Sequence, residues 1–412
     1  MNITIIGTGY VGLTAAICFA NSGHKIISID KDEEKINLLK SGKSPIYEKN
    51  MEEMLCQAID SGNIEFSTNL EYGIKNSIIN ILAVGTPQSE NSGDADLSYI
   101  FSASKEMAQY IDEYKLIIVK STVPIGTNHE VQQIIEKNSG QKIDIASNPE
   151  FMREGFAIED FMNPDRIIAG IESDKSQKLI KKLYQKWMEN NFPILFTDIK
   201  TAELIKYSSN AFLMTKIAFI NEISNLAEAA NCNISDLTKA MGMDQRIGSK
   251  FLNPGPGIGG SCFPKDSLAL SHIGKKYQQN LAILDQVIAS NNQRFADMSQ
   301  KIAKITQNNK KIAILGLAFK SGTDDVRMSP AIEIIKYLLQ DNFDITAFDP
   351  EAMENSKKIL GNGIKYADNI KQCYDSSQYI VILTEWVEFK EIVNYLDFKE
   401  KILIDLRNII PK

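Results

Sequence analysis

The side chains best suited to covalent chemistry lie around Cys262, in the segment NPGPGIGGSCFPKDSLAL that covers residues 253–270. Its glycines permit close approach of the backbone to a ligand, and Pro264 is typical of the first turn of a helix. We therefore expect Cys262 just before a helix N-terminus, where unpaired N–H groups and the helix dipole favour the nucleophilic thiolate. Most cysteines are instead buried apolar residues, and that is our interpretation of Cys18.

Two pairs of polar residues repeat at the spacing of one helical turn. Cys262 and Asp266 are four residues apart, and so are Lys206 and Asn210. Each pair therefore shares one face of its expected helix, and the two faces can meet across a cleft. A lysine beside a thiol that attacks an aldehyde can stabilise the developing oxyanion and exchange protons. The simpler interpretation of Lys206 is a solvated surface side chain.

Two further polar segments follow apolar runs that are typical of buried strands. SNPEFMREG contains Glu150 and Glu154, and KSTVPIGT contains Thr122. Ligands of α/β folds bind at strand ends, where carboxylates can act as general bases or hold water. The alternatives are an exposed, capped helix start for the glutamates and a turn for Thr122. The three histidines have no ligand spacing with Cys or acidic residues, so the sequence does not predict a metal site.

The N-terminal segment contains a glycine pattern typical of dinucleotide binding. Gly7, Gly9 and Gly12 lie between an expected strand and an expected helix, which would place a pyrophosphate on the helix N-terminus. A structural turn is the alternative for the glycines alone. Asp30, at the end of the next strand, can accept hydrogen bonds from a ribose diol and would repel a 2′-phosphate. We therefore expect NAD rather than NADP, although Lys31 and Lys35 are nearby.

These residues require an α/β fold with a helical centre. Alternating short apolar runs and helical spacing predict a doubly wound domain over residues 1–196. A helix over 201–230 and further helical segments from Pro264 towards Gln307 predict an all-helical domain over 197–305. Strand-like runs return over 311–412 and predict a second Rossmann-like domain. There the glycine fingerprint is absent; Lys320 and Arg327 are candidate phosphate contacts, or parts of a solvated loop balanced by Asp324 and Asp325.

Composition limits the class of protein. The 412 residues carry 45 Lys and Arg against 52 Asp and Glu, and no dense basic block indicates nucleic-acid binding. The five cysteines lack CxxC spacing, which favours a reducing, cytoplasmic setting. The uncharged stretch up to His24 is interrupted by glycines and lacks a basic start, so we expect neither a signal peptide nor a membrane span.

Taken together, these motifs resemble the UDP-glucose/GDP-mannose dehydrogenase family along essentially the whole chain. The resemblance rests on GTGYVG with Asp30, VGTP, STVPIGT, SNPEFMREG, AELIKYSSNAF, DQRIG, FLNPGPGIGGSCFPKD and GLAFKSGTDDVRMSP. It implies a four-electron oxidation of the C6 alcohol of UDP-glucose with two NAD. Cys262 would capture the aldehyde as a thiohemiacetal that is oxidised to a thioester.

The resemblance also assigns roles to individual residues. Lys206 would stabilise the oxyanion with Asn210 as a hydrogen-bond partner, Asp266 and Thr122 would position water or protons, and Glu150 would assist thioester hydrolysis. The implied NAD contacts are Val11, Asp30, Lys35, Thr86, Thr122, Glu154, Lys265 and Arg327. The implied nucleotide-sugar contacts are Glu150, Phe151, Glu154, Lys206, Asn210, Arg246, Phe251, Leu252, Asn253, Pro254, Gly255, Gly259 and Lys320. The resemblance further implies a homodimer formed by the central helices, with Arg246 reaching the neighbouring subunit's site.

Three alternatives remain open at this point. A sibling enzyme would act on GDP-mannose or on a UDP-N-acetylhexosamine, because the loop NPGPGIGG differs among family members. A two-electron hydroxyacid dehydrogenase of similar topology would have no need of Cys262. A non-catalytic, NAD-sensing regulatory protein would have no need of Cys262, Lys206, Asp266 or Glu150.

Overall fold

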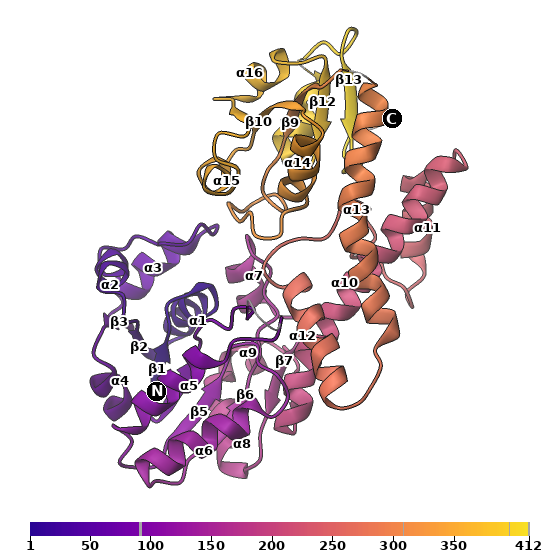
Figure 1. The fold of residues 1–412 in the computed structure, drawn as a ribbon. Helices are drawn as coiled ribbons and strands as arrows, with labels where there is room; N and C mark the ends of the chain where they lie inside the picture. The colour runs from indigo at the N-terminus through magenta and orange to yellow at the C-terminus, as the bar shows by residue number, and fades with distance from the viewer. Residues whose placement is uncertain (90–92, 308, 395, 411–412) are drawn as a thin grey trace. The chain divides into compact units, whose positions relative to one another are not determined.

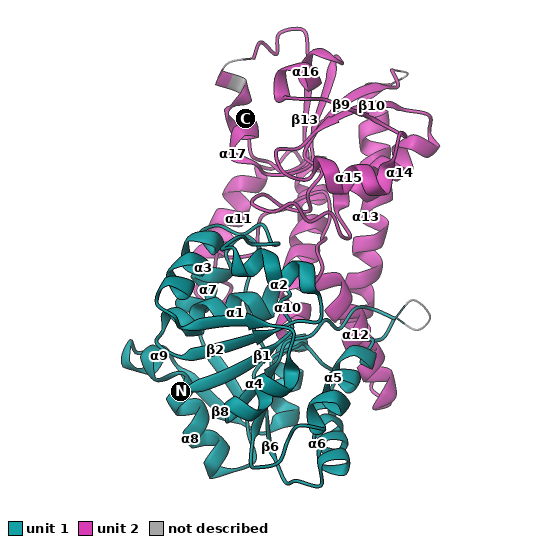
Figure 2. Ribbon diagram, turned by 90° about the vertical axis from the view of Figure 1, so that its left-hand side faces the viewer, with its two compact units in different colours: residues 1–208 teal, residues 209–412 magenta. Residues whose placement is uncertain are grey.

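The computed structural model describes residues 1–89, 93–307, 309–394 and 396–410. The chain forms two compact units, unit 1 from Met1 to Ser208 and unit 2 from Ser209 onward (Figure 2). The long helix α10, Ile199–Ala229, is labelled in Figure 1. It begins in unit 1 and continues in unit 2.

Unit 1 is built on an eight-stranded sheet with the order β3-β2-β1-β4-β5-β6-β7-β8. Neighbouring strands are parallel from β3 to β6, whereas β7 is antiparallel to β6 and parallel to β8. Helices cover both faces, which explains the nearly continuous apolar strand sequences. The strands are β1 Asn2–Ile6, β2 Lys25–Ile29, β3 Ile64–Ser67, β4 Ile79–Leu82, β5 Leu116–Val119, β6 Asp144–Ser147, β7 Ile167–Gly170 and β8 Ile194–Thr197.

Side chains that alternate along each strand feed two separate cores in unit 1. Ile3 and Ile5 of β1 pack on one face with α1, α2, α3, α7, α8 and α9, whereas Ile6 packs on the other face with α4, α5 and α6. The helices are α1 Tyr10–Asn21, α2 Glu33–Lys40, α3 Met51–Asp60, α4 Leu70–Asn76, α5 Ser98–Ala108, α6 Thr127–Ser139, α7 Ala157–Met162, α8 Asp174–Leu183 and α9 Gln185–Glu189.

The strand order places the candidate ligand residues at one edge of this sheet. β2 and β4 lie on opposite sides of β1, so the order of the strands reverses there, and ligands of α/β sheets bind at such points. Because β1, β2, β4, β5 and β6 are parallel, the segments that follow them share this edge.

Unit 2 combines most of α10 and the helices α11 to α13 with a second sheet that has helices of its own. Helix α12 packs against α13, and α13 packs against α14 at the sheet. Met214, Ala218, Ile258 and Val287 form a small apolar core between the helices and the loop before α12. After α10 the helices of this part are α11 Ile234–Met243, α12 Phe263–Lys276 and α13 Ala282–Thr306.

The second sheet has five parallel strands in the order β11-β10-β9-β12-β13. Its core is continuous with the inner faces of α13 and α14, where Ile302 and Ile334 are fully buried. The elements are β9 Lys311–Leu315, α14 Pro330–Gln340, β10 Asp344–Phe348, α15 Met353–Leu360, β11 Lys365–Tyr366, α16 Ile370–Asp375, β12 Tyr379–Ile382, α17 Val387–Glu391 with the short 3-10 turn Ile392–Asn394, and β13 Ile402–Asp405.

This architecture confirms the expected fold class. Two largely parallel, Rossmann-like sheets and a helical segment between them in sequence are present, and the helix expected over 201–230 is α10. Five elements were not anticipated from the sequence: β3, β7, β8, β11 and α11. None of the helices in the described part of the chain has an apolar stretch long enough to cross a membrane.

Candidate functional site

Three glycines shape the turn between β1 and α1. Gly7 has a φ of +99°, and a Cβ there would lie 2.6 Å from the carbonyl oxygen of Ala83. A Cβ on Gly12 would lie 1.9 Å from the carbonyl oxygen of Gly7, so glycine is needed for α1 to start this close to the turn. Gly9, by contrast, has no atom within 4 Å of its Cβ position. The turn therefore leaves open backbone at the N-terminus of α1, which fits a pyrophosphate; Val11 follows in the first helical turn.

Asp30 lies at the end of β2, next to this turn. Its Oδ2 accepts hydrogen bonds from the Thr8 N–H at 2.9 Å and the Thr8 hydroxyl at 2.6 Å, and the Lys35 ammonium lies at 3.3 Å. Burial raises the pKa of Asp30, but the hydrogen bonds from Thr8 and Asp32 and the charge of Lys35 outweigh burial and lower that pKa below its usual value. An ionised carboxylate at this place fits the hydroxyls of a ribose.

The loops after β4 and β5 are joined through the two threonines expected to contact NAD. The Thr86 hydroxyl donates to the carbonyl oxygen of Thr122 at 2.9 Å. The adjacent Ser121 hydroxyl donates to the carbonyl oxygen of Val84 at 2.7 Å. The two loops therefore form one hydrogen-bonded rim at the carboxyl edge of the sheet.

Glu150 and Lys206 form a buried ion pair in unit 1. Lys206 Nζ lies 2.9 Å from Glu150 Oε1, and the two side chains are only 4% and 9% exposed. Glu150 Oε2 also accepts from the Met152 N–H at 2.6 Å, and Lys206 Nζ lies 5.3 Å from the ring centre of Phe151. The interpretation of Lys206 as a solvated surface residue is therefore wrong, because burial and pairing fix both charged groups. Glu154 follows in the same loop and is half-buried.

Tyr10 and Glu48 hold this loop from the side of the dinucleotide turn, and the sequence analysis missed both. Glu48 accepts hydrogen bonds from the Gly155 N–H at 2.9 Å, the Ala157 N–H at 3.0 Å and the Tyr10 hydroxyl. Burial, together with the bond to Glu48, raises the pKa of Tyr10. Tyr10 is part of the glycine motif and could have been noted, whereas Glu48 lies in an irregular segment without any motif.

Lys120, buried at the end of β5, is a third residue that was missed from the sequence. Its Nζ donates to Asn148 Oδ1 at 3.1 Å, and the Tyr184 hydroxyl donates to the same oxygen at 2.5 Å. Burial lowers the pKa of Lys120 from 10.5 to about 8, with the nearby Glu150 opposing this shift. Lys120 therefore fixes Asn148, which leads into the loop with Glu150.

Glu203 anchors α10 to the loop after β5. Its carboxylate is buried and accepts from the Gly126 N–H at 2.6 Å, the Asn128 N–H at 2.9 Å and the Asn128 side-chain amide at 2.6 Å. Since Glu203 precedes Lys206 by about one turn of α10, the anchor also fixes the orientation of Lys206.

In unit 2, Cys262 lies directly before α12, as expected from the sequence. The helix begins at Phe263, and the Asp266 N–H donates to the Cys262 carbonyl oxygen at 2.8 Å. Asp266 is buried, and its Oδ2 accepts from the side-chain amide of Asn210 on α10 at 2.6 Å. Lys265 Nζ forms an ion pair with Asp266 Oδ1 at 2.8 Å. The expected meeting of the two helix faces is thus confirmed for Asn210 and Asp266.

The loop before Cys262 is tightly packed. Phe251 has a φ of +65° and its ring contacts Phe263, whereas Leu252, Pro254 and Gly255 are buried and Asn253 is exposed. A Cβ on Gly259 would lie 2.3 Å from the Met328 carbonyl oxygen. The Gly260 N–H donates to the Arg327 carbonyl oxygen at 3.0 Å, so this loop contacts the segment after β9.

Three further candidate cations of unit 2 differ in exposure, since Arg246 and Arg327 are exposed and Lys320 is half-buried. Arg246 pairs with Asp244 at 2.6 Å, and its side chain is 89% exposed. Arg327 pairs with Asp325 at 2.7 Å, which agrees with a basic loop balanced by acidic residues. Lys320 lies over the ring of Phe319, 5.5 Å from its centre. Arg407, which the sequence analysis missed, donates to the Leu383 carbonyl oxygen at 2.8 Å and borders Gly255.

Each unit therefore brings together a separate part of the candidate set. Unit 1 contains the dinucleotide turn with Asp30, the threonine rim and the pair of Glu150 and Lys206. Unit 2 contains Cys262 with its loop and the bonded pair of Asn210 and Asp266. Among the described residues, no group of three or more His, Cys, Asp or Glu side chains is arranged to hold a metal ion.

Comparison with known proteins identifies the family. The family models of the UDP-glucose/GDP-mannose dehydrogenases match residues 1–188 (NAD binding domain), 200–293 (central domain) and 313–412 (UDP binding domain). The UDP-glucose 6-dehydrogenase of Rickettsia felis is 46% identical over 100% of this chain and 93% of that protein. A UDP-glucose dehydrogenase structure from the archaeon Pyrobaculum islandicum has a TM-score of 0.94 at 34% identity, covering 99% of this chain and 94% of that chain. A UDP-D-ManNAc dehydrogenase structure from Pyrococcus horikoshii has a TM-score of 0.87 at 28% identity, covering 100% and 96%. The chain belongs to the UDP-glucose/GDP-mannose dehydrogenase family and is an NAD-dependent oxidoreductase.

Proposed function

We propose that the enzyme oxidises the C6 alcohol of UDP-glucose to the carboxylate of UDP-glucuronate in two steps that use two NAD. The observation that carries this proposal is the cluster at the start of α12. Cys262 precedes the helix, and Asp266, one turn later, is bonded to Asn210. A two-electron dehydrogenase has no need of a nucleophilic thiol, whereas a four-electron enzyme needs a group that retains the aldehyde.

Covalent capture by Cys262 divides the oxidation into manageable steps. When bound, NAD supplies the hydride acceptor for both oxidations. The Cys262 thiolate adds to the aldehyde carbon, the resulting thiohemiacetal is oxidised to a thioester, and water cleaves the thioester. Lys206 stabilises the oxyanion because Glu150 keeps its ammonium ion-paired and fixed in place. Asn210 serves as a hydrogen-bond partner of the reacting group.

The hydrolytic step depends on carboxylates and a hydroxyl. Glu150 assists the attack of water on the thioester, and its oriented Oε2, bonded to the Met152 N–H, supports that role. Asp266 and Thr122 position water or protons. The buried side-chain amide of Asn210 orients Asp266, because it donates a hydrogen bond to Asp266 Oδ2.

The binding residues form part of the same proposal. We assign the NAD contacts to Gly7, Gly9, Val11, Gly12, Asp30, Lys35, Thr86, Thr122, Glu154, Lys265 and Arg327, and the nucleotide-sugar contacts to Glu150, Phe151, Glu154, Lys206, Asn210, Arg246, Phe251, Leu252, Asn253, Pro254, Gly255, Gly259 and Lys320. The 46% identity to a protein named UDP-glucose 6-dehydrogenase supports glucose as the sugar. The similarity to a UDP-D-ManNAc dehydrogenase makes a UDP-N-acetylhexosamine the second candidate.

We also propose three domains, residues 1–196, 197–305 and 311–412, a cytoplasmic location and a homodimer. Exposed apolar side chains on α10 support the dimer: Phe212 is 66% exposed, Phe219 51% and Leu226 64%. They are spaced by seven residues and so follow one face of the helix. Exposed apolar stripes of this kind are typical of subunit interfaces.

Replacing Cys262 with serine tests the covalent route. We expect Cys262→Ser to bind NAD and UDP-glucose nearly as the wild type does but to form no UDP-glucuronate, because a serine ester route lacks the nucleophilic thiolate. Titration calorimetry measures binding, and chromatography of the products measures acid formation. Cys232→Ser, which removes an exposed thiol outside the proposed site, is the matched control and should remain active. Acid formation by Cys262→Ser at the wild-type rate would refute the proposal.

A further inference from the structure

Side chains hold the loop before Cys262 by hydrogen bonds to its backbone. Within residues 253–260, both the N–H and the carbonyl oxygen of Gly255 and of Ile258 are bonded to buried side chains of α10 and α13. We call these three side chains, Asn221, Asn291 and Arg294, the loop clamp. Each is at least nine-tenths buried. The clamp thus fixes two points of a loop that otherwise consists mainly of glycine and proline.

Asn291 of α13 binds Ile258 in the way that a neighbouring strand would. Its Oδ1 accepts from the Ile258 N–H at 2.7 Å, and its Nδ2 donates to the Ile258 carbonyl oxygen at 3.0 Å. Both polar atoms of the amide are therefore used. Ile258 precedes Cys262 by four residues, so this pairing lies close in sequence to the thiol.

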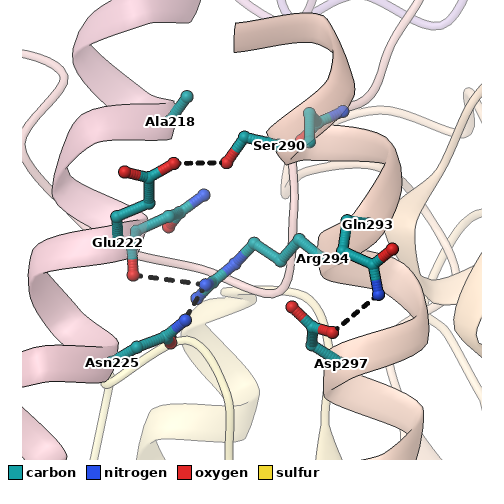
Figure 3. A pocket seen from close by; sticks show the side chains of 9 residues that line it. Ala218, Glu222, Asn225, Ser290, Gln293, Arg294 and Asp297 are labelled. Atoms are coloured by element: carbon teal, nitrogen blue, oxygen red, sulfur yellow. Dashed lines mark hydrogen bonds between the residues drawn. The ribbon is translucent and has the colours of Figure 1, made fainter. Parts of the chain in front are cut away.

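Asn221 and Arg294 share the second point of the clamp. Asn221 Oδ1 accepts from the Gly255 N–H at 2.8 Å, and Arg294 Nε donates to the Gly255 carbonyl oxygen at 2.7 Å. The guanidinium of Arg294 also donates to the Asn221 carbonyl oxygen and to Asn225 Oδ1, each at 3.2 Å. Figure 3 shows Arg294 extending from α13 to Asn225 on α10.

Arg294 is a cation held by neutral acceptors. Its side chain borders a polar cavity of about 190 Å³ between α10 and α13 (Figure 3). Among the described residues, no carboxylate forms an ion pair with it. Burial lowers the pKa of Arg294 to about 10, so the side chain remains charged at neutral pH. Burying a charge without a counter-ion costs free energy of folding. Here the buried guanidinium fixes the carbonyl group of Gly255 in the loop.

Close packing around the loop glycines restricts the conformation of the loop in addition to the clamp. Gly257 has a φ of +152°, and a Cβ there would lie 2.4 Å from the ring of Phe295, the residue after Arg294. A Cβ on Gly260 would lie 2.6 Å from the ring of Phe319. The loop is therefore packed against side chains on both sides of Ile258, and the clamp supplies the polar partners that this packing requires.

We propose that Asn221, Asn291 and Arg294 are positioning residues that set the place of the sugar-binding loop and of Cys262. This inference rests on the proposed function, in which residues 251–255 and 259 contact the nucleotide sugar and Cys262 captures the aldehyde. Small displacements of reacting groups reduce rates strongly, by about 100-fold for a shift of about 1 Å. A clamp at Gly255 and Ile258 prevents such displacements without contacting the substrate.

Substitutions of the two asparagines can distinguish the proposed positioning role from a general role in packing. Asn221 uses only its Oδ1, because its Nδ2 has no hydrogen-bond partner, whereas Asn291 uses both Oδ1 and Nδ2. Replacing asparagine with aspartate keeps the acceptor and removes the donor. Asn221→Asp should therefore retain the clamp, and Asn291→Asp should break half of it and set an oxygen against the Ile258 carbonyl oxygen.

The test compares five single variants with the wild-type enzyme. Asn221→Leu, Asn291→Asp and Arg294→Met break the clamp, and Asn221→Asp preserves it. Ser290→Ala is the control, because it removes the hydrogen bond from Ser290 to Glu222 across the same cavity and leaves the three clamp side chains in place. We measure kcat and KM for UDP-glucose, the dissociation constant of NAD, the melting temperature, and the rate at which iodoacetamide alkylates Cys262, with the exposed Cys232 as internal reference.

We expect the three clamp-breaking variants to lose about 10- to 100-fold in kcat, to raise KM for UDP-glucose and to change the alkylation rate of Cys262 relative to Cys232. NAD affinity should stay unchanged in all of them. Asn221→Asp and Ser290→Ala should match the wild type in every kinetic value. A purely structural role would instead lower the melting temperature while leaving kcat, KM and relative alkylation unchanged in the folded variants.

The outcomes separate this inference from the proposed function. Wild-type kinetics and alkylation in Asn221→Leu, Asn291→Asp and Arg294→Met would overturn the clamp, as would equal losses in Asn221→Asp and Asn221→Leu. If the wild type does not oxidise UDP-glucose, or if Cys262→Ser forms the acid at the wild-type rate, the proposed function fails. Relative alkylation of Cys262 then still decides the clamp, because that measurement needs no turnover.

Discussion

At the scale of single residues, Lys120 is a buried lysine near the site whose charge lowers the stability of the fold. Its ammonium is buried beside Asn148, and burial lowers its pKa to about 8. The charge also faces those of Glu150, which raises this pKa, and of Lys206, which lowers it. Below pH 8 the fold therefore contains a buried charge whose main partners are neutral.

The stability of the protein should depend on pH through this residue. In the unfolded chain lysine holds its proton up to about pH 10.4, whereas folded Lys120 loses it near pH 8. Between these values the unfolded state binds more protons, so the free energy of unfolding rises with pH. The destabilisation is fully present below pH 8 and is relieved above it.

Lys120→Met removes this titration. Relative to the variant, the wild type should gain roughly 3 kcal/mol of unfolding free energy between pH 7 and pH 10.5, as expected for a shift of this size. Urea unfolding of both proteins across this range measures the difference. Curves that stay parallel would show that Lys120 does not titrate in this window.

At the scale of elements, two glycines of the turn between β1 and α1 have different roles, one in packing and one in cofactor binding. Gly12 contacts the carbonyl group of Gly7, whereas Gly9 faces open space. Gly9 has a φ of −72°, which any residue can adopt. The two glycines therefore serve different purposes although they belong to one motif.

Substituting alanine at the two positions should give opposite results. Gly12→Ala should lose about 1–3 kcal/mol of stability, because its Cβ overpacks against backbone that cannot yield easily. Gly9→Ala should keep wild-type stability but bind NAD weakly, since the added methyl occupies the approach to the pyrophosphate. Thermal unfolding and NAD titration of both variants provide the check. Wild-type NAD affinity in Gly9→Ala would contradict the assignment of this turn to the pyrophosphate.

Helices and strands with a regular apolar pattern were predictable from the sequence. The side chains that hold the loops between them through tertiary contacts were not. The apolar runs of β1, β4 and β5 and the spacing along α10 predicted those elements because burial imposes a period on the sequence. The start of α12 after Cys262 followed from Pro264. Glu48 and Lys120 could not be found, because their contacts with Gly155 and Asn148 are tertiary and leave no local signal. The strand β7, IIAG, was missed because a run of four residues is too short for its pattern to distinguish a strand from other structure.

At the scale of the whole molecule, the proposed dimer rests on the stripe formed by Phe212, Phe219 and Leu226. A charged side chain in its middle should be incompatible with a buried interface. Phe219→Asp should therefore shift the protein from dimer to monomer in light scattering after size-exclusion chromatography. Activity should fall with it, because Arg246 is proposed to act at the neighbouring subunit's site.

Tyr99→Asp provides the control for this substitution. Tyr99 lies on α5 in unit 1, is 58% exposed and is outside the stripe, so the variant should keep both the dimer and the activity. A monomeric wild-type protein, or a Phe219→Asp variant that remains dimeric, would contradict the proposed interface.

The number of NADH formed per UDP-glucose decides whether the enzyme carries out the proposed four-electron oxidation. Wild-type enzyme is allowed to consume limiting UDP-glucose with excess NAD, and the NADH formed is measured by absorbance, with GDP-mannose and a UDP-N-acetylhexosamine as parallel substrates. We expect two NADH per UDP-glucose and little turnover of the other sugars. One NADH per UDP-glucose would contradict the thioester route through Cys262, and preferred turnover of another sugar would contradict the assigned substrate.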